Sequence, residues 1–244
     1  MISGELDPEQ LGRGKPTLRS FRAEPVELPG ARVFQAMFEM TGAAREAVVP
    51  PALHPTIPAA LVILAWSCPE SPFGPFSLVQ VRAQVRSGVR PRGLVLGALC
   101  DTEPARRELR ERWGFPAELG RIDFRQGYDG TRLLAERDGK ACLEIVALDP
   151  TPLAPGDVQY SATLNPAHTE RGLRLVQIEP EVQATRSERL SARLLHFDAA
   201  AWNEPRLDPY HPVSASVASA DIHIPGLRYV CRPDVMAFVG TEAV

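Results

Sequence analysis

The chain has 244 residues, which suits one large domain or two small ones and allows a core that needs no disulfide or metal. Hydrophobic residues make up 44% of it and charged residues 23%, as in ordinary soluble globular proteins. The net charge of −3 gives no reason to expect nucleic acid or an anionic membrane as a partner.

The cysteines and histidines show no metal-binding pattern. The four cysteines are far apart and form no C-x-x-C pair, so we expect free buried thiols, and no histidine has a partner at metal-ligand spacing. We therefore predict no metal and no cofactor.

The start of the chain does not read as a signal peptide, and the longest apolar run, residues 57–66, is too short to cross a bilayer. We expect a cytoplasmic protein without a membrane partner.

The first half of the chain reads as an arm followed by strands. Residues 1–30 are polar and rich in proline and glycine, so we expect an irregular N-terminal arm before a single domain at 31–244. Alternating residues 33–40 predict a strand, and Thr41 is suited to cap a short helix that ends before Pro50. Short apolar or alternating segments predict further strands at 61–66, 77–86 and 93–100.

A second helix is expected to begin near Thr102, where a polar cap, an acid and a proline coincide, and to end at Gly114. Glycine-bearing turns then separate a meander of strands, whereas the prolines of 149–167 indicate a loop-rich segment. The predicted strands of this half are 121–125, 131–137, 141–148, 172–178 and 182–197. The pattern alone predicts a mainly antiparallel α+β or barrel-like domain.

Residues 110–119, RERWGFPAEL, close the second helix, turn at Gly114 and meet Pro116 before an extended segment. This stretch resembles the signature of the acetoacetate decarboxylase superfamily, roughly G-R-E-x-x-G-[FY]-P-K-K. Residues 48–53, VVPPAL, resemble the family's V-V-P-x-x-L. Pro212-Val213 followed by residues 220–225, ADIHIP, resembles its closing pattern at a slightly shorter spacing. The resemblance spans about residues 33–225.

The resemblance implies a specific fold and assembly. Proteins of this family form a curved, cone-like β structure around a central apolar cavity, and they are usually oligomeric. We therefore predict an α+β, mainly antiparallel β fold, with a curved sheet or cone-shaped barrel around a central cavity, in a homo-oligomer.

The resemblance also shows a missing nucleophile. The family's Schiff-base lysine follows the proline of the motif, and its imine is the electron sink for decarboxylation. This chain has Ala117 there, and Glu118 replaces the second lysine. Two glutamates of the family fall at Leu78 and Ile63. Because several polar groups are lost together, the resemblance implies a more apolar cavity without the family's usual imine.

We expect the pocket to be lined by apolar residues together with two polar ones on the strand face of Leu78. Arg82 can hold a carboxylate or polarise a carbonyl there, but a solvated strand face is the alternative. Glu118 is the candidate catalytic acid or base, unless the turn directs it outward. The predicted lining is Ala117, Leu78, Ile63, Phe115, Gln80 and Arg82, and Arg110, Glu111, Gly114 and Pro116 are predicted to have a structural role in the turn.

Only two lysines are available to replace the missing amine. Lys140 follows Asp138-Gly139 in a predicted hairpin turn, where an exposed lysine is ordinary, and Lys15 lies in the arm. We expect neither to take over the role of the Schiff-base lysine.

Two hypotheses for the function remain. One is an enzyme that acts without a Schiff base on an apolar ketone or polyketide-like molecule, by cyclisation, dehydration or another lyase step. The other is a non-catalytic protein that binds an apolar small molecule.

Overall fold

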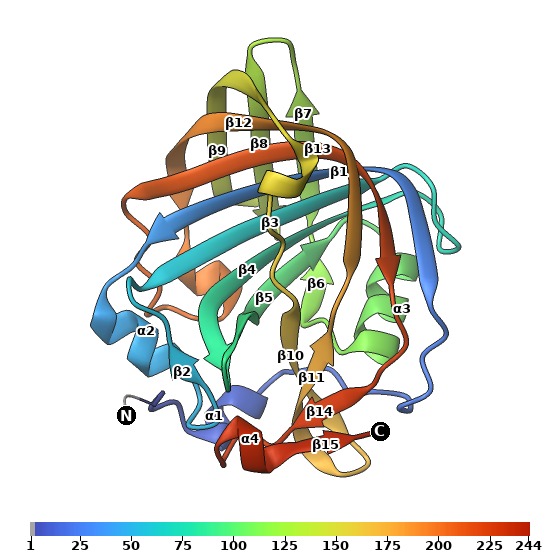
Figure 1. The fold of residues 1–244 in the computed structure, drawn as a ribbon, viewed down its shortest axis with the longest axis vertical. Coiled ribbons are helices and arrows are strands. Elements are labelled where there is room, and N and C mark those ends of the chain that lie inside the picture. Colours follow the sequence, from blue (N-terminus) through green and yellow to red (C-terminus); the bar gives the residue numbers. More distant parts are fainter. Residues whose placement is uncertain (1–2) are drawn as a thin grey trace.

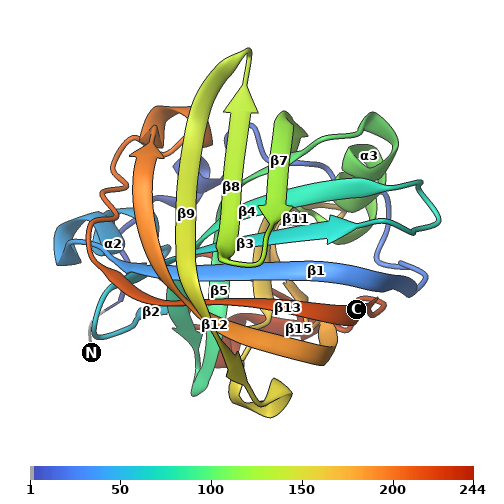
Figure 2. The same ribbon diagram turned by 90° about the horizontal axis from the view of Figure 1, so that it is seen from above.

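A computed structural model describes residues 3–244, which form a single sheet of 15 strands with a few short helices (Figure 1). The strands follow the order β15-β14-β11-β10-β5-β4-β3-β1-β13-β12-β9-β8-β7, with β2 beside β4 and β6 beside β5. Neighbouring strands are antiparallel except in two pairs, β5–β10 and β5–β6. The sheet is strongly curved, as the view from above shows (Figure 2).

The first eight strands are β1 Val26–Glu39, β2 His54–Pro55, β3 Ala60–Cys68, β4 Phe76–Ser87, β5 Arg90–Cys100, β6 Ala117–Leu119, β7 Arg121–Gln126 and β8 Gly130–Arg137. The others are β9 Lys140–Leu153, β10 Thr163–Thr169, β11 Gly172–Ile178, β12 Glu181–Phe197, β13 Pro212–Ile224, β14 Tyr229–Cys231 and β15 Thr241–Ala243. The helices are α1 Pro8–Gly12, α2 Gly42–Val48, α3 Glu103–Trp113, α4 Ala237–Gly240 and the 3-10 turns η1 Pro155–Asp157 and η2 Ala199–Trp202.

The predicted α+β, mainly antiparallel fold is confirmed, but the sheet is not a closed barrel. It ends in two separate edge strands, β7 and β15. Both strands are short, which limits the number of unpaired backbone groups that each edge exposes. The domain therefore keeps its curved sheet without the hydrogen-bonded closure that a barrel requires.

Buried apolar side chains lie on both faces of the central strands. In β3, Leu61, Ile63 and Ala65 join one core cluster, whereas Leu64 and Trp66 join the other. This division follows from the pleat, which directs successive side chains to opposite faces. Burial on both faces also explains the continuous apolar run of β3.

The predicted helix boundaries are confirmed. Thr41 caps α2, and its Oγ1 accepts a hydrogen bond from the amide of Ala44 at 3.2 Å. α3 ends at Gly114, whose φ of +69° places it in the left-handed region that favours glycine. This turn redirects the chain into β6 and so sets the direction of residues 117 and 118.

Two segments are more regular than the sequence indicated. The N-terminal arm contains α1, and β1 begins at Val26 within the segment expected to be irregular. Residues 149–167 include the end of β9, the turn η1 and the start of β10. Pro166 lies opposite Leu175 of β11, beyond the two residues of β10 that pair with β5, and a strand tolerates a proline where no neighbouring strand needs its N–H. All four cysteines are free and buried, as expected. Within residues 3–244, no helix is long and apolar enough to cross a membrane.

Candidate active site

A pocket of about 700 Å³ lies between the N-terminal arm, the β5–β6 edge and the segment that follows η2. Its size is within the usual range for small-molecule sites. It is lined by Leu6, Gln10, Leu11, Arg13, Gly14, Lys15, Leu96, Pro116, Glu118, Arg137, Asn203, Glu204, Pro205 and Arg206. Six of these fourteen residues are charged, so the pocket is polar rather than apolar.

The arm is attached to the domain on both sides of Lys15. Before it, the carboxylate of Asp7 caps α1, and Leu11 is buried in the core. After it, the backbone carbonyl of Pro16 accepts from the amide of His168 at 2.8 Å, and the amide of Leu18 donates to the carbonyl of His168 at 2.8 Å. The arm runs from α1 past the lower part of β10, where Thr17 bridges to His168 (Figure 1). Lys15 is therefore held in place rather than carried on a loose tail.

Lys15 lies in the arm, as expected, but the structure also places it in this pocket. Its ammonium group enters the pocket and donates a hydrogen bond of 2.7 Å to the carbonyl of Leu96 in β5. Burial lowers the pKa of Lys15 to about 8, and Arg110 acts in the same direction, while the carboxylates of Glu204 and Glu118 oppose the shift. Lys140 is exposed at the β8–β9 turn, as predicted.

Glu118 reaches the pocket from β6. Residues 117–119 pair in parallel with 98–100 of β5, and Glu118 lies opposite Leu99. Arg110 of α3 holds this edge: its Nη1 donates to Glu118 Oε1 at 2.7 Å and to the carbonyl of Ala117 at 2.8 Å. The guanidinium thus fixes the orientation of the carboxylate that faces Lys15 across the pocket.

The third wall comes from the segment after η2, which packs directly on β5. A Cβ at Gly97 would meet the carbonyl oxygen of Trp202 at 2.9 Å, so glycine is required for this close approach. Glu204 binds Arg206 through two hydrogen bonds of 2.5 and 2.7 Å. Arg137 donates to the carbonyl of Ala201 at 2.6 Å and so links the β8–β9 hairpin to the same wall.

The pocket lining carries more cationic than anionic side chains. Arg13, Lys15, Arg137 and Arg206 contribute four cationic groups against the two carboxylates of Glu118 and Glu204. Arg206 pairs with Glu204, and Glu118 is bound by Arg110 of α3, so Arg13, Lys15 and Arg137 leave an excess of positive charge that favours an anionic ligand. An adjacent groove of about 740 Å³ shares Arg13 and Gly14 with the pocket and has more apolar lining, including Leu173, Pro8 and Pro233.

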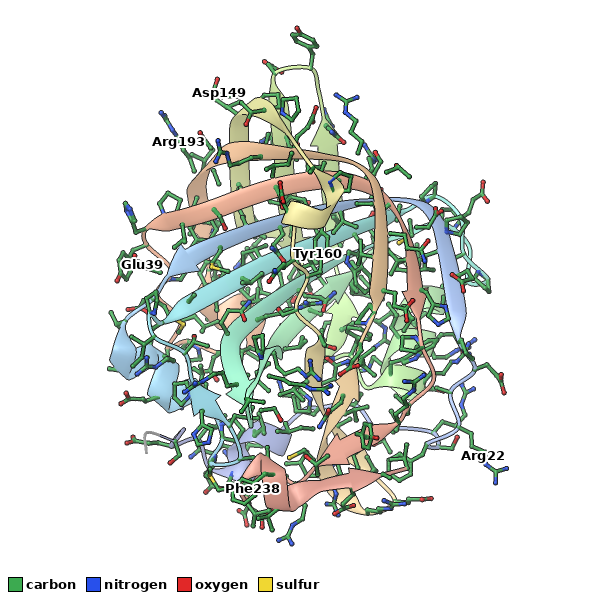
Figure 3. The ribbon with its side chains drawn as sticks, in the orientation of Figure 1. Arg22, Glu39, Asp149, Tyr160, Arg193 and Phe238 are labelled. Atoms are coloured by element: carbon green, nitrogen blue, oxygen red, sulfur yellow. The ribbon has the colours of Figure 1, made fainter. Side chains whose placement is uncertain are left out.

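Ala117 faces the opposite side of the sheet from Glu118. The register aligns Gln80 with Ala98 and Ala98 with Ala117, so these three side chains share a face. This face is packed with apolar residues: Ala117, Phe115 and Leu78 are completely buried in one cluster, and the rings of Phe115 and Trp66 meet edge to face at 6.2 Å. Tyr160 packs against the same cluster and lies over the middle of the sheet (Figure 3).

Gln80 and Arg82 are buried on this face and do not form the solvated row that was the alternative for them. Arg82 donates to Gln80 Oε1 at 2.7 Å through Nη2 and to the carbonyl of Ser161 at 3.3 Å. Burial lowers the pKa of Arg82 to about 9, which still leaves the guanidinium charged at neutral pH. Arg82 and Gln80 therefore form a buried polar pair on the face that also carries Ala117, and Ala98 of β5 separates Gln80 from Ala117.

The structure thus distributes the predicted site residues over two faces. Ala117, Leu78, Gln80, Arg82 and Phe115 lie on one face, and Ile63 and Glu118 lie on the other. Pro116 lines the pocket. Arg110 and Glu111 do not pair with each other, because Arg110 binds Glu118 and Glu111 binds Arg19.

Sequence reasoning missed Lys15, Arg137, Glu204 and Arg206 as pocket residues. No local pattern marks the last three, since they meet only through the packing of η2 on β5. For Lys15 one signal was present: it is one of only two lysines in a chain whose other basic residues are arginines. Among residues 3–244, no group of three or more His, Cys, Asp or Glu side chains is arranged to hold a metal.

The model of the acetoacetate decarboxylase (ADC) family matches residues 15–230 of the chain. No protein of curated function matches it significantly. Among solved structures, an acetoacetate decarboxylase from Legionella pneumophila is similar with a TM-score of 0.70 and 17% identity, covering 84% of this chain and 86% of that one.

Two other solved structures are similar. The enduracididine biosynthesis enzyme MppR in complex with pyruvate has a TM-score of 0.69 and 16% identity, covering 87% and 97% of the two chains. An acetoacetate decarboxylase-like enzyme from Sphingomonas wittichii has a TM-score of 0.66 and 12% identity, covering 84% and 92%. At these identities the likeness to solved structures establishes the fold.

Proposed function

Because the chain belongs to the acetoacetate decarboxylase family, we propose that it is an enzyme acting on a small carbonyl compound in the Glu118 pocket. The reaction is of lyase or cyclase type and does not use an imine at position 117. The observation that carries this proposal is the placement of Glu118 in a cationic pocket on the face opposite to Ala117.

The catalytic step proposed for Glu118 is proton transfer at the carbon next to the carbonyl. A carboxylate within reach of that C–H removes the proton, and the cations of the lining stabilise the negative charge that develops on the carbonyl oxygen. Proton removal at this carbon is the first step of cyclisations and of eliminations of water. It needs no electron sink at position 117, where Ala117 has no amine.

The charge of the pocket supports a substrate with its own negative charge. Our hypothesis from the sequence was an apolar or polyketide-like ligand, and an apolar body can still lie against Leu6, Leu11 and Leu96. The excess of cations favours a carboxylate at one end. A 2-oxo acid combines a carbonyl and a carboxylate, and the related enzyme MppR was solved with pyruvate.

Hydrogen–deuterium exchange of the pyruvate methyl group in D₂O, followed by NMR, tests this proposal. We expect the protein to accelerate exchange and Glu118→Gln to lower the rate about 10²–10⁴-fold, as for the loss of a general base. Glu170→Gln, at an exposed turn away from the pocket, is the control. Exchange that is equally fast in Glu118→Gln would remove Glu118 from the mechanism.

A second candidate function is non-catalytic binding of an apolar small molecule, which the more apolar groove beside the pocket supports. Saturable binding of a ligand that is recovered unchanged, together with no hydrogen–deuterium exchange of pyruvate, would favour it.

The cytoplasmic location and the homo-oligomer stay predictions. For an oligomer, the exposed side chains of Phe238 and Val239 beside the edge strand β15 offer an apolar contact (Figure 3).

A further inference from the structure

Among the residues that the structure describes, Lys15 is the one primary amine that lines the candidate pocket, and it is not fully explained by a structural role. Its ammonium donates one hydrogen bond, to the carbonyl of Leu96, although it has three N–H groups. Among residues 3–244 it forms no salt bridge with a carboxylate.

The geometry around Lys15 fits an amine that reacts. We propose that Lys15 is a catalytic residue whose amine attacks the carbonyl carbon of the substrate and forms a transient imine in this pocket. The inference rests on the proposed function, since it assigns a residue to the same site, and it departs from the hypothesis of a reaction without any Schiff base. The amine comes from the N-terminal arm and from the face of the sheet opposite to Ala117.

The step balances within the groups of the pocket. The neutral amine adds to the carbonyl carbon, and a carboxylate relays one proton from the nitrogen to the carbonyl oxygen, which becomes a hydroxyl. The same carboxylate then relays the second nitrogen proton to this hydroxyl, which leaves as water and leaves the imine. Glu118 and Glu204 both line the pocket and can relay these protons. Hydrolysis of the imine after the reaction restores the lysine and the new carbonyl product.

The surroundings of Lys15 also supply the neutral amine that attack requires. Burial lowers its pKa to about 8, so at pH 7 about a tenth of the molecules carry the free amine. An ordinary lysine has a pKa of about 10.4, and its free-amine fraction at the same pH is roughly two orders of magnitude smaller. The nearby cations can hold a substrate carboxylate while the carbonyl approaches the nitrogen.

The chain offers a matched internal control because it has only one other lysine. Lys140 is exposed at the β8–β9 turn, so any amine reagent can reach it. The full-length protein is incubated near pH 7 with pyruvate and sodium borohydride, which reduces an imine to a stable secondary amine. Peptide mapping by mass spectrometry then compares the adduct on Lys15, on Lys140 and on the α-amino group of the chain.

We expect the adduct on Lys15 to form roughly 100-fold faster than that on Lys140, in line with their free-amine fractions. Lys15→Arg keeps the charge and a donor toward Leu96 but should lose both the adduct and the pyruvate exchange, whereas Lys140→Arg should keep both. Equal labelling of the two lysines, or exchange that persists in Lys15→Arg, would overturn the inference. Those results would leave the proposed function standing, because that depends on the response to Glu118→Gln.

If Lys15→Arg fails to fold, the wild-type protein still decides the question. Saturating pyruvate without borohydride should protect Lys15 from a general amine reagent while leaving Lys140 unprotected. Protection of neither lysine would contradict an imine at Lys15.

Discussion

Ala117 and Glu118 are consecutive residues of β6, yet they belong to two different environments. Ala117 faces a packed apolar layer beside Phe115 and Leu78, and Glu118 faces a pocket that contains Lys15. The pleat of a strand produces this separation, because successive side chains point to opposite faces. The face that carries residue 117 is filled, while the other face is hollow, polar and supplied with an amine. Losing a motif residue therefore does not show that a chain has lost the corresponding functional group.

The largest expected effect comes from returning a lysine to the packed face. In Ala117→Lys the ammonium would be buried in the apolar cluster that contains Phe115 and Leu78. We expect a loss of about 3–5 kcal/mol in the free energy of unfolding, measured in urea, since an unpaired buried charge is strongly destabilising. The control Ala117→Met adds a similar length without charge and should cost about 1–3 kcal/mol through overpacking. If Ala117→Lys is as stable as Ala117→Met and reacts with pyruvate, the two faces are less different than the structure indicates.

An intermediate effect is expected on the pocket side. Lys15 has a pKa lowered from 10.5 to about 8 in the folded protein, so folding disfavours its charged form. Below pH 8 the folded and unfolded chains both carry the proton, and the full cost is present. Between pH 8 and 10.5 the unfolded chain binds more protons, so the stability contributed by this group rises with pH. Lys15→Met should therefore stabilise the protein by about 1–3 kcal/mol at pH 7.

The advantage of Lys15→Met over the wild type should shrink as the pH rises from 8 toward 10.5. Taking the difference between the two proteins removes the opposite trend of the buried cysteines, whose raised pKa values lower stability at high pH. The charged groups that surround the amine remain in both: Glu118, Glu204, Arg110, Arg137, Arg206 and Arg13. Lys140→Met should change stability by less than about 0.5 kcal/mol at any pH. A constant difference between wild type and Lys15→Met would mean that the amine is not desolvated.

The fold was predictable because its signals are local. The alternation in residues 77–86, the cap at Thr41 and the left-handed turn at Gly114 each reflect the conformation of a few neighbouring residues. The site was only partly predictable. Residue 118 follows directly from the motif, but Lys15 lies 103 positions earlier in the chain and Glu204 lies 86 positions later. They meet only because the arm pairs with His168 and η2 packs on Gly97, and no periodicity encodes such contacts.

The smallest expected effect tests whether the pocket selects its ligand by charge. Arg13 is exposed at the junction of the pocket and the adjacent groove, so Arg13→Ala should change stability by less than about 0.5 kcal/mol. It removes one of four cations from the lining, and we expect the Kd for pyruvate, measured by calorimetry, to rise about threefold at low salt. Screening should reduce this difference as salt is added, because an exposed charge acts through solvent. Arg107→Ala removes another exposed arginine, from α3 and outside the pocket, and should leave the Kd unchanged. If the two variants behave alike, the net charge of the chain matters rather than the lining, and the case for an anionic substrate then depends on Lys15, Arg137 and Arg206 alone.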